Sequence, residues 1–431
     1  MAKPKLALIP ASQGDKLYSV LPSGGVGDFD FTRNSSATRI NKDGLIETVG
    51  SGVSRLNYPM IDGVVSGCPS HILEPQRSNS FSYSQDFSNS YWTKSGSSIS
   101  SDLTISPDGT LNADKLIENS DTVEHFLRRS IAVPIGFYTW SVFVKASDRK
   151  YIVLRTNADG GAYKNACFDV ELGIVVYDGL HNSEANIEAF PNGWYRISAL
   201  SKETSGTTRN YQIHISNSPI VNNSGISYNG DGTSGIYLYG VQLELGHKSS
   251  YIPTTTAAVT RSAETATGSG DAATFNDSEG VLMAEISELT EDSGLSRRIT
   301  ISDGSTNNRV SIELDETEGL IKLFFSGNGT LNQLTKNISD VYTPFKILAS
   351  YELNSLKLYI NGYKLTEDTS IVLPNGLNDL SFDSGTGGSN FYGNTKQIQY
   401  YDTALSDTDL ETLTSWVSFQ EMAEGQLYTI E

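Results

Sequence analysis

The sequence is poor in the residues and runs that define several large protein classes. It has only two cysteines, Cys68 and Cys167, which are too few for a disulfide-stapled framework, and we expect both to be reduced, small buried groups. No apolar run approaches the ~20 residues that a membrane-spanning helix needs. The opening stretch MAKPKLALIPAS is too short, and too soon interrupted by proline, for a secretory signal. These absences predict a soluble chain without a targeting segment.

The motifs of common catalytic sites are missing as well. There is no G-x-S-x-G nucleophile elbow, no G-x-x-x-x-G-K-[ST] phosphate loop, and no G-x-G-x-x-G after a strand and before a helix. None of the five histidines has the H-E-x-x-H or a similar zinc-binding spacing, so each is expected at the surface or satisfied in the core. We therefore expect no enzymatic activity and no cofactor.

Positive charge is scarce, above all in the second part of the chain. The formal net charge is −19, and residues 271–431 hold 25 acidic but only 9 basic residues. Acidic surfaces repel phosphate backbones and anionic lipid, so nucleic-acid binding and membrane association are disfavoured. A well-solvated surface is the simplest interpretation of this acidity.

What the sequence has in abundance favours β-structure. Its 431 residues include 39 Gly and 22 Tyr with many Ser, Thr and Asn, a composition of turns and half-buried strands. The length exceeds what one core organises, so we expect two or three domains. The sequence predicts an all-β protein in which a small N-terminal extended or hairpin unit precedes two antiparallel β-sandwich (jelly-roll) domains.

The first unit, residues 1–77, predicts a hairpin and little other regular structure. Phe29 and Phe31 alternate on one face, and the stretch Asn41–Gly44 then forms a turn before a strand at Leu45–Val49. The following stretch, Asn57–Arg77, is broken by three prolines, which disfavours central strands. Such a unit buries little surface alone, so we expect it to need a neighbouring domain or a second subunit.

Residues 78–254 show strands at regular intervals, as a sandwich should. One strand slips register at Gly240, where a bulge is plausible. The predicted strands are Lys115–Glu118, Glu124–Ala132, Tyr138–Lys145, Lys150–Thr156, Asn165–Asp169, Ile174–Tyr177, Asn186–Phe190, Trp194–Lys202, Tyr211–Ser216 and Gly235–Glu244.

The remaining chain divides into three parts. Residues 255–279 are small and polar without periodicity, so we interpret them as a linker. Residues 280–417 repeat the strand and turn pattern of a second sandwich, which closes with a strand at Gln397–Tyr401 and a short helix capped by Ser406. Residues 418–431 form an acidic C-terminal tail to which we assign no role.

Several stretches also resemble known families. PSGGVGDFDFTRNSSATRINKDGLIE, with LNYP and CPSHILEPQRSNSFSYSQDFSNSYW, resembles the N-terminal region shared by many bacteriophage virion proteins, particularly tail and head fibres. SPDGTLNADKL, GFYTWSVFVKA, NGWYRIS and GIYLYGVQLELGHKSSYIPT resemble a carbohydrate-binding jelly roll, and LKLYINGYKL with YYDTALSDTDLETL resembles a concanavalin-like or laminin-G-like domain. At residues 78–81, Ser-Asn-Ser-Phe stands where a more apolar stretch is expected.

The resemblance implies a structural fibre protein of a bacteriophage particle, made in the host cytoplasm and carried on the virion. Such fibres are typically homotrimers, attached through the N-terminal unit to capsid or tail proteins and projecting their sandwiches towards host-surface polysaccharide. A polysaccharide-degrading enzyme and a purely structural decoration protein are the alternatives. The residues that would serve the anchor are Phe29, Phe31, Arg33, Arg39 and Arg77.

Glycan binding needs aromatic faces and a few polar partners for hydroxyl groups. The candidates are Tyr163 in the loop DGGAYKN, Trp194 and Tyr195 at the start of a strand, and Tyr392 in GTGGSNFYGN. The pattern around Trp194 also fits a core residue, so that alternative stays open.

Two further possibilities rest on oxygen-bearing side chains. Asn229 and Asp231 in YNGDGTSG resemble part of a calcium loop, although turn formation explains the same residues. The acidic pairs Asp169 with Glu171, and Glu313 with Asp315, have the i, i+2 spacing of a catalytic carboxylate pair or of a wet sheet face.

Overall fold

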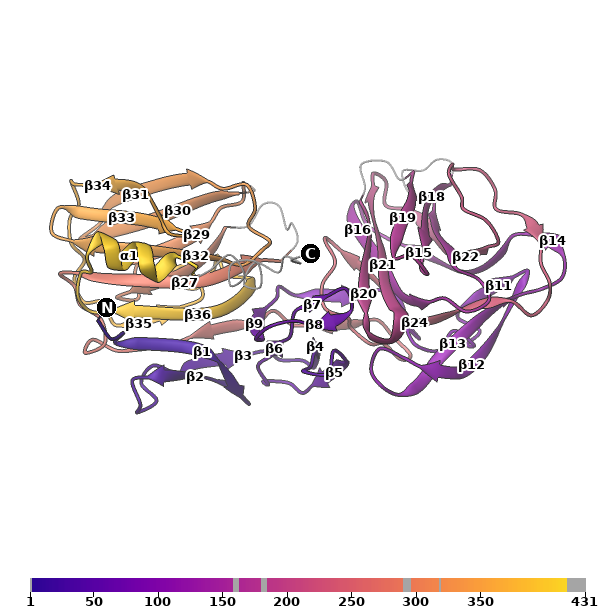
Figure 1. Ribbon diagram of the computed structural model, residues 1–431, viewed down its shortest axis with the longest axis horizontal. Coiled ribbons are helices and arrows are strands. Elements are labelled where there is room, and N and C mark those ends of the chain that lie inside the picture. Colours follow the sequence, from indigo (N-terminus) through magenta and orange to yellow (C-terminus); the bar gives the residue numbers. More distant parts are fainter. Residues whose placement is uncertain (1, 158–162, 180–183, 290–295, 318, 417–431) are drawn as a thin grey trace.

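The computed structural model describes residues 2–157, 163–179, 184–289, 296–317 and 319–416. The chain forms two β-lobes joined by residues 2–77, which we call the N-terminal segment. This segment runs beneath one lobe and reaches the other (Figure 1). Antiparallel strands dominate, so the predicted all-β class is confirmed. Within the described residues, no helix is both long and apolar enough to cross a membrane.

One lobe is a sandwich of two six-stranded sheets built from residues 93–245. The first sheet has the order β11-β15-β22-β17-β18-β19, with bounds Thr93–Ser95, His125–Ala132, Thr208–Ser216, Tyr151–Thr156, Lys164–Asp169 and Ile174–Asp178. The second has the order β12-β13-β24-β16-β21-β20, with bounds Ser97–Ile105, Leu111–Glu118, Gly235–Leu245, Gly136–Lys145, Trp194–Glu203 and Ala185–Phe190. All ten predicted strands of this lobe are present. A short pair, β14 (Thr122–Val123) and β23 (Tyr228–Asn229), lies at its far end.

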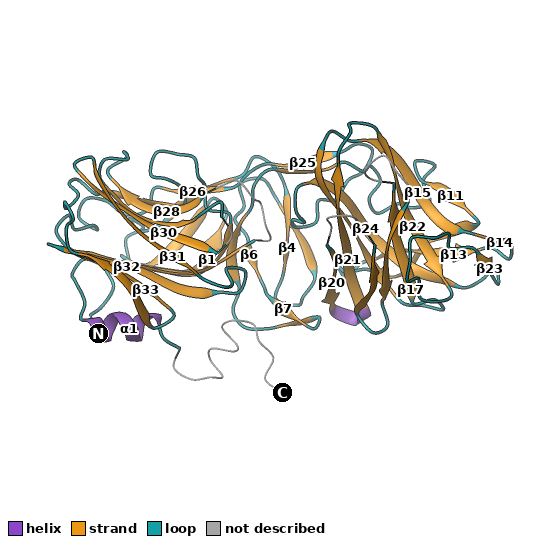
Figure 2. Ribbon diagram, turned by 90° about the horizontal axis from the view of Figure 1, so that it is seen from above, coloured by secondary structure: helices purple, strands orange, loops and turns teal. Residues whose placement is uncertain are grey.

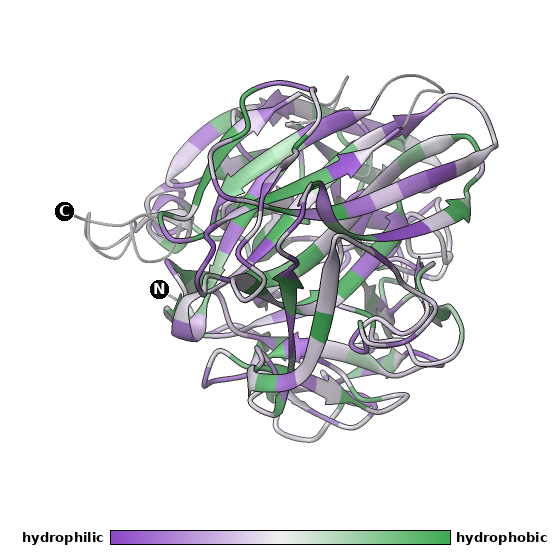
Figure 3. Cartoon of the chain, turned by 90° about the vertical axis from the view of Figure 1, so that its right-hand side faces the viewer, coloured by the Kyte–Doolittle hydropathy of each residue, from purple (hydrophilic) through white to green (hydrophobic). Residues whose placement is uncertain are grey.

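Alternating side chains build the core of this sandwich. In β16, Trp140, Val142 and Val144 are buried in the core, and the strands show alternating hydropathy (Figure 3). The predicted slip at Gly240 is confirmed, because the β16–β24 register shifts between Ser141 and Phe143. Gly240 has a φ of 59°, and a Cβ atom there would approach the ring of Phe143 to 3.0 Å. A glycine therefore permits both the bulge and the close packing.

The second lobe is a sandwich whose smaller sheet comes entirely from its own region. That sheet has the order β31-β30-β29-β28-β35, with bounds Thr330–Asn337, Leu320–Gly327, Arg309–Leu314, Arg297–Ser302 and Asp379–Ser381. The facing strands β36, β27, β32, β33 and β34 span Gly393–Tyr401, Gly280–Glu288, Phe345–Glu352, Ser355–Ile360 and Tyr363–Asp368. Helix α1 (Asp407–Thr414) packs on this sheet, and its predicted cap is confirmed, because Ser406 Oγ accepts from Asp409 N at 3.2 Å.

The N-terminal segment extends the larger sheet of this second lobe. β1 (Leu6–Gln13) pairs with β36, and the sheet continues through β2 (Lys16–Leu21) and β3 (Phe29–Thr32) to β26 (Thr265–Thr267). β9 (Ser70–Leu73) pairs with both β36 and β6 (Leu56–Asn57). Phe29 and Phe31 therefore lie in the core of the second lobe. Their strand is not part of the predicted hairpin, which instead joins β4 (Ala37–Ile40) to β5 (Ile46–Val49) around Gly44.

The same segment also packs against the first lobe. Ile46 joins Phe143, Phe190, Trp194 and Tyr251 of that lobe in one buried apolar cluster. Its backbone N–H donates to Pro107 O at 2.9 Å. The hairpin β7 (Met60–Ile61) and β8 (Val64–Val65) lies beside β20 in both views (Figures 1 and 2). The N-terminal segment thus packs against both neighbouring domains, as expected for a unit that buries little surface alone.

The predicted linker 255–279 is ordered along the N-terminal segment. β25 (Val259–Arg261) pairs with β10 (Arg77–Asn79), and β26 pairs with β3. The division at residue 77 stays a prediction, although hydrogen bonding crosses it at these strands. The tail 418–431 lies outside the described residues.

Five charged side chains with almost no exposure meet where these segments converge: Arg33, Arg55, Glu74, Arg261 and Glu264. We call them the buried charge cluster. Arg33 Nη1 lies 2.7 Å from Glu264 Oε1, and Arg55 Nε lies 2.8 Å from the same oxygen. Arg55 Nη2 and Arg261 Nη1 lie 2.7 and 2.8 Å from Glu74 Oε2.

Each carboxylate in this cluster contacts two of its three guanidinium groups. Burial favours a neutral Glu74, but the guanidinium groups of Arg261 and Arg55 outweigh it and hold the pKa of the carboxyl well below its usual range. Hydrogen bonds from Ser250 N and Oγ, at 2.8 and 2.6 Å, act in the same direction. The cluster therefore joins the N-terminal segment, the end of the first lobe and the linker through ionised groups.

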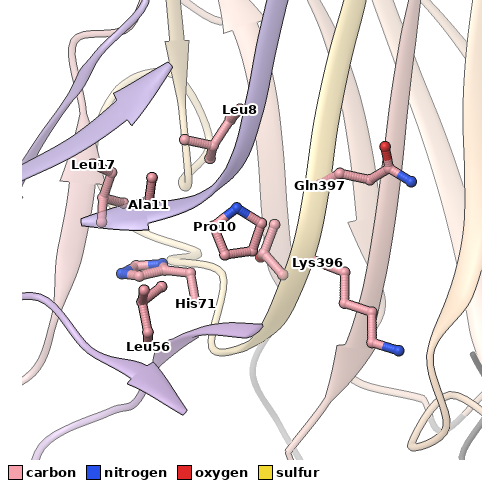
Figure 4. Close-up of a pocket in the computed structure, with 9 residues that line it drawn as sticks. Leu8, Pro10, Ala11, Leu17, Leu56, His71, Lys396 and Gln397 are labelled. Atoms are coloured by element: carbon pink, nitrogen blue, oxygen red, sulfur yellow. The ribbon is translucent and has the colours of Figure 1, made fainter. Parts of the chain in front are cut away.

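A small cavity of ≈ 10 Å³ lies at the seam between β9 and β36, lined by His71, Leu8 and Leu56 among others (Figure 4). His71 is 2% exposed, and neither ring nitrogen has a hydrogen-bond partner among the described residues. Burial and the nearby Arg55 charge lower the pKa of His71 to about 3. The ring is therefore neutral in the folded protein across the physiological range.

The buried charge cluster predicts a large cost for removing one charge. Glu264→Gln leaves Arg33 and Arg55 with one partner fewer in a buried site, so we expect the free energy of unfolding to fall by about 3–5 kcal/mol. Urea unfolding followed by tryptophan fluorescence measures the change. The control is Glu47→Gln, whose side chain is 42% exposed and pairs with Arg39, and which should cost at most about 1 kcal/mol. Equal losses of stability in the two variants would contradict the stabilising role assigned to the buried charge cluster.

His71 predicts acid sensitivity. Above pH ~6.5 the imidazole is neutral in both states. As the pH falls towards 3, the unfolded chain binds a proton that the folded chain does not, so stability falls by up to about 1.4 kcal/mol per pH unit. His71→Leu should flatten the dependence of the unfolding free energy on pH between 6.5 and 4. Leu56→Ala in the same cavity wall should lower stability equally at each pH, and a His71→Leu profile as steep as the wild type would refute the prediction.

Candidate functional site

The outer face of one sheet of the first lobe carries a continuous row of polar side chains. In β22, Tyr211, Ile213 and Ile215 enter the core, so the alternate residues Asn210, Gln212 and His214 face the other way. The neighbouring strands and the chain before β18 add further groups to this side. We define the amide face as Ser130, Arg155, Tyr163, Asn210, Gln212 and His214.

Hydrogen bonds connect the amide face into one network. Tyr163 Oη accepts from Asn210 Nδ2 at 3.1 Å and from Gln212 Nε2 at 3.3 Å. Ser130 Oγ donates to Asn210 Oδ1 at 2.5 Å. At the other end, His214 Nε2 lies 2.8 Å from Gln212 Oε1. Each amide therefore has a fixed orientation, which is the condition for selective recognition of hydroxyl groups.

The protonation state of His214 supports this arrangement. The residue is fully buried, and burial with the Arg155 charge holds its pKa well below the usual range. A neutral ring whose Nε2 carries the proton donates to Gln212 Oε1, which directs the Gln212 amide group towards Tyr163. His214 is thus a positioning residue for the amide face.

Tyr163 presents the aromatic group of this face. Its ring is half-buried, and the Arg155 guanidinium lies 4.5 Å from the ring centroid. Arg155 is itself held by Glu124, with Nη1 2.8 Å from Oε1. Phe126 adds a second half-buried ring, 4.7 Å from that of His214. An aromatic plane beside oriented amides suits a ligand with one apolar face and hydroxyls at its edge.

The adjoining part of the same sheet face is covered by the loop before β23. Asn165 Nδ2 donates to Asn222 O at 2.8 Å and to Ser224 O at 3.1 Å. Ile226 packs with Val153 and Cys167 in a small apolar cluster. This loop occupies one side of the face. Near Tyr163, Ser130 and Asn210 are partly exposed, whereas Gln212 and Arg155 are only 4% and 8% exposed.

The other predicted glycan residues lie elsewhere. Trp194 is 1% exposed, and its Nε1 donates to Ile105 O at 3.0 Å in the contact between lobe and hairpin. A ring so enclosed cannot stack on a sugar, which corrects the binding role and favours the core alternative. Tyr195 is half-buried on the opposite sheet, against Gly173. Tyr392 is half-buried in the second lobe, where its hydroxyl accepts from Asn390 at 3.2 Å.

The possible calcium residues are occupied by their own turn. Asp231 Oδ1 accepts from Thr233 N at 2.8 Å and from Ser234 N at 2.7 Å, and these bonds with that of Ser234 Oγ hold the pKa of Asp231 well below its usual range. Asn229 Oδ1 accepts from Thr122 Oγ1 at 3.1 Å. No group of three His, Cys, Asp or Glu side chains suited to a metal occurs in the part of the chain that the structure describes. Calcium stays an untested prediction.

The predicted anchor residues fall into two groups. Phe29, Phe31 and Arg33 are buried within this chain, the last in the buried charge cluster. Arg39 is half-buried and pairs with Glu47 at 2.8 Å, while Arg77 is half-buried at the start of β10. The three buried residues hold the N-terminal segment to the rest of this chain. They are therefore not available for attachment to a bacteriophage particle, which would have to contact other residues.

Three smaller expectations concern thiols and carboxylates. Cys167 is buried as expected, but Cys68 is exposed in a loop, because the stretch around Pro69 runs at the surface. Asp169 pairs with Lys150 at 3.2 Å. Glu313 forms an ion pair with Arg298, and Asp315 forms one with Lys322. These carboxylates are thus engaged in structural ion pairs.

Sequence reasoning reached Tyr163 but missed its partners. Asn210, Gln212 and His214 lie in the stretch NYQIHIS, where polar residues alternate with apolar ones. That alternation was the available signal, because it places three polar groups on one face of a predicted strand. Ser130 carried no comparable signal, because polar and apolar residues do not alternate in RRSIA around it.

Comparisons with known proteins show limited similarity. No protein family matches the chain, and no curated protein does. Among solved structures, the CBM40 of a Ruminococcus gnavus sialidase covers 32% of this chain and 84% of its own, with 14% identity and a TM-score of 0.29. Domain 4 of the Geobacillus stearothermophilus arabinanase AbnA, in complex with arabinotriose, covers 40% and 83%, with 12% identity and a TM-score of 0.30. Sheep galectin-11 covers 28% and 85%, with 8% identity and a TM-score of 0.20. At this level, the similarity carries no information about this chain's ligand.

Proposed function

We propose that this protein is a glycan-binding adhesin without catalytic activity and that the amide face is its binding site. The observation that carries the proposal is the network in which Tyr163 accepts hydrogen bonds from Asn210 and Gln212. A sugar ring stacks on an aromatic plane while its hydroxyl groups bond to fixed amides, and this face supplies both.

We further propose that the adhesin belongs to a bacteriophage particle. The support is the resemblance of the stretch from Pro22 to Glu47 and of the following blocks to the N-terminal region of phage fibre proteins. The protein is then a virion component made in the host cytoplasm, and its sandwiches contact host-surface polysaccharide. Because a weak site gains strength by repetition, a homotrimer would raise the avidity of each fibre.

The amide face gives a direct test. Tyr163→Ala removes the aromatic plane, and Gln212→Ala removes one oriented donor. Each should weaken binding to host capsular or cell-wall polysaccharide at least tenfold, or about 1.4 kcal/mol, in biolayer interferometry. Tyr195→Ala on the opposite sheet is the matched control and should bind like the wild type. If both variants retain wild-type affinity, the site is wrongly assigned.

The products of incubation separate an adhesin from an enzyme. The adhesin should retain polysaccharide and release neither reducing ends nor unsaturated sugars over hours. Released sugar would establish the alternative of a degrading enzyme, and a protein that neither binds nor cleaves would be a purely structural decoration.

Oligomeric state tests the fibre assignment separately. Light scattering at micromolar concentration should give three times the chain mass of 46.8 kDa. A monomeric mass would remove the trimer but leave the amide face intact. A map of the particle that shows what contacts residues 1–77 would test the proposed attachment.

A further inference from the structure

A second concave site lies where the two lobes and the N-terminal segment meet. This cleft has a volume of ≈ 490 Å³, within the range of ~300–1,000 Å³ usual for small-ligand sites. We call it the junction cleft. Its walls include Tyr58 and Met60 from the N-terminal segment, Phe190 and Lys248 from the first lobe, and Leu289 and Tyr342 from the second.

The fold explains why this hollow persists. β7 and β20 meet at one wall, where Gly63 lies so close to Phe190 that a Cβ atom would approach its carbonyl oxygen to 2.7 Å. Among the other lining residues, Thr38 Oγ1 donates to Tyr251 O at 2.6 Å. Ser250 donates to Glu74 of the buried charge cluster. The walls are therefore fixed by contacts that a ligand does not need to create.

The charged groups lining the cleft nearly balance and are largely paired. Three cations and four carboxylates line it: Arg39, Arg196, Lys248, Asp62, Glu74, Glu188 and Glu288. Glu188 lies 2.5 Å from Lys248 and Glu288 lies 2.9 Å from Arg297, while Arg39 pairs with Glu47. Arg196 donates to Ser249 O at 2.8 Å. Because most of these charges already have partners, the cleft offers little net attraction to an ion.

The uncharged lining combines rings with hydroxyl and amide groups. The lining includes the half-buried rings of Tyr58 and Tyr342 together with Asn57, Asn394 and Ser249. We infer that the junction cleft binds a neutral, hydroxyl-rich saccharide of a few units, in contact with all three parts of the chain. This inference rests on the proposed function, but it assigns a site separate from the amide face.

The expected result is two sugars per chain. Equilibrium dialysis with three labelled neutral trisaccharides, chitotriose, cellotriose and maltotriose, measures the stoichiometry at saturation. Met60→Trp fills the cleft and Tyr58→Ala removes one of its rings, so each should lower the stoichiometry from two to one. Val64→Trp, on the paired strand and 67% exposed, lies outside the lining and should leave two. Circular dichroism checks that each variant is folded.

Comparing variants of the amide face with variants of the junction cleft makes the outcomes distinct. If one sugar binds to the wild type and Tyr163→Ala abolishes it while Tyr58→Ala and Met60→Trp do not, the junction cleft is refuted and the amide face stands. If only the cleft variants abolish binding, the cleft stands and the amide face is refuted. No binding of any of the three sugars overturns the junction cleft, while the amide face is judged by the polysaccharide test given above. A wild-type ratio of two that falls to one in Tyr163→Ala and in either folded cleft variant supports both sites.

Discussion

The arrangement of the two lobes depends on ion pairs that are buried away from solvent. Arg55 alone contacts both glutamates of the buried charge cluster, one from the N-terminal segment and one from the linker. Ionised groups in such a place are costly unless each is matched, so the segments that carry them tolerate few alternative positions. We regard this specificity of position, more than added stability, as what the cluster contributes.

The N-terminal segment has no core of its own and belongs to both lobes. Phe29 and Phe31 complete the core of the second lobe, while Ile46 packs in the cluster beneath the first. The junction cleft is lined by this segment and by both lobes. The amide face, in contrast, is built entirely within one sandwich, so the two sites differ in how far they depend on lobe placement.

The first lobe could be predicted from sequence because its strands alternate strongly. Strand β12 was missed, since SSISSDLTI is an edge strand with polar groups on both faces. The strands β25 and β26 were missed because three residues each, Val-Thr-Arg and Thr-Ala-Thr, are too few to give a periodic signal. The pairing of β1 with β36 was beyond local reasoning, because nothing in LALIPASQ identifies a partner almost 400 residues away. For the sites, the loop around Tyr163 indicated an exposed aromatic residue. The cluster arginines are far apart in sequence, and Arg33 was assigned to an anchor because no sequence pattern links it to Glu264.

The position of β1 has a consequence for how the protein is made. Leu6 pairs with Tyr400, so a strand near the start of this sequence must wait for one near its end before the larger sheet can form. Contacts this distant in sequence slow folding, and during synthesis the apolar face of β1 has no permanent partner while the first lobe is already able to form. The second lobe is therefore the part whose assembly would most benefit from chaperones or from docking to other chains.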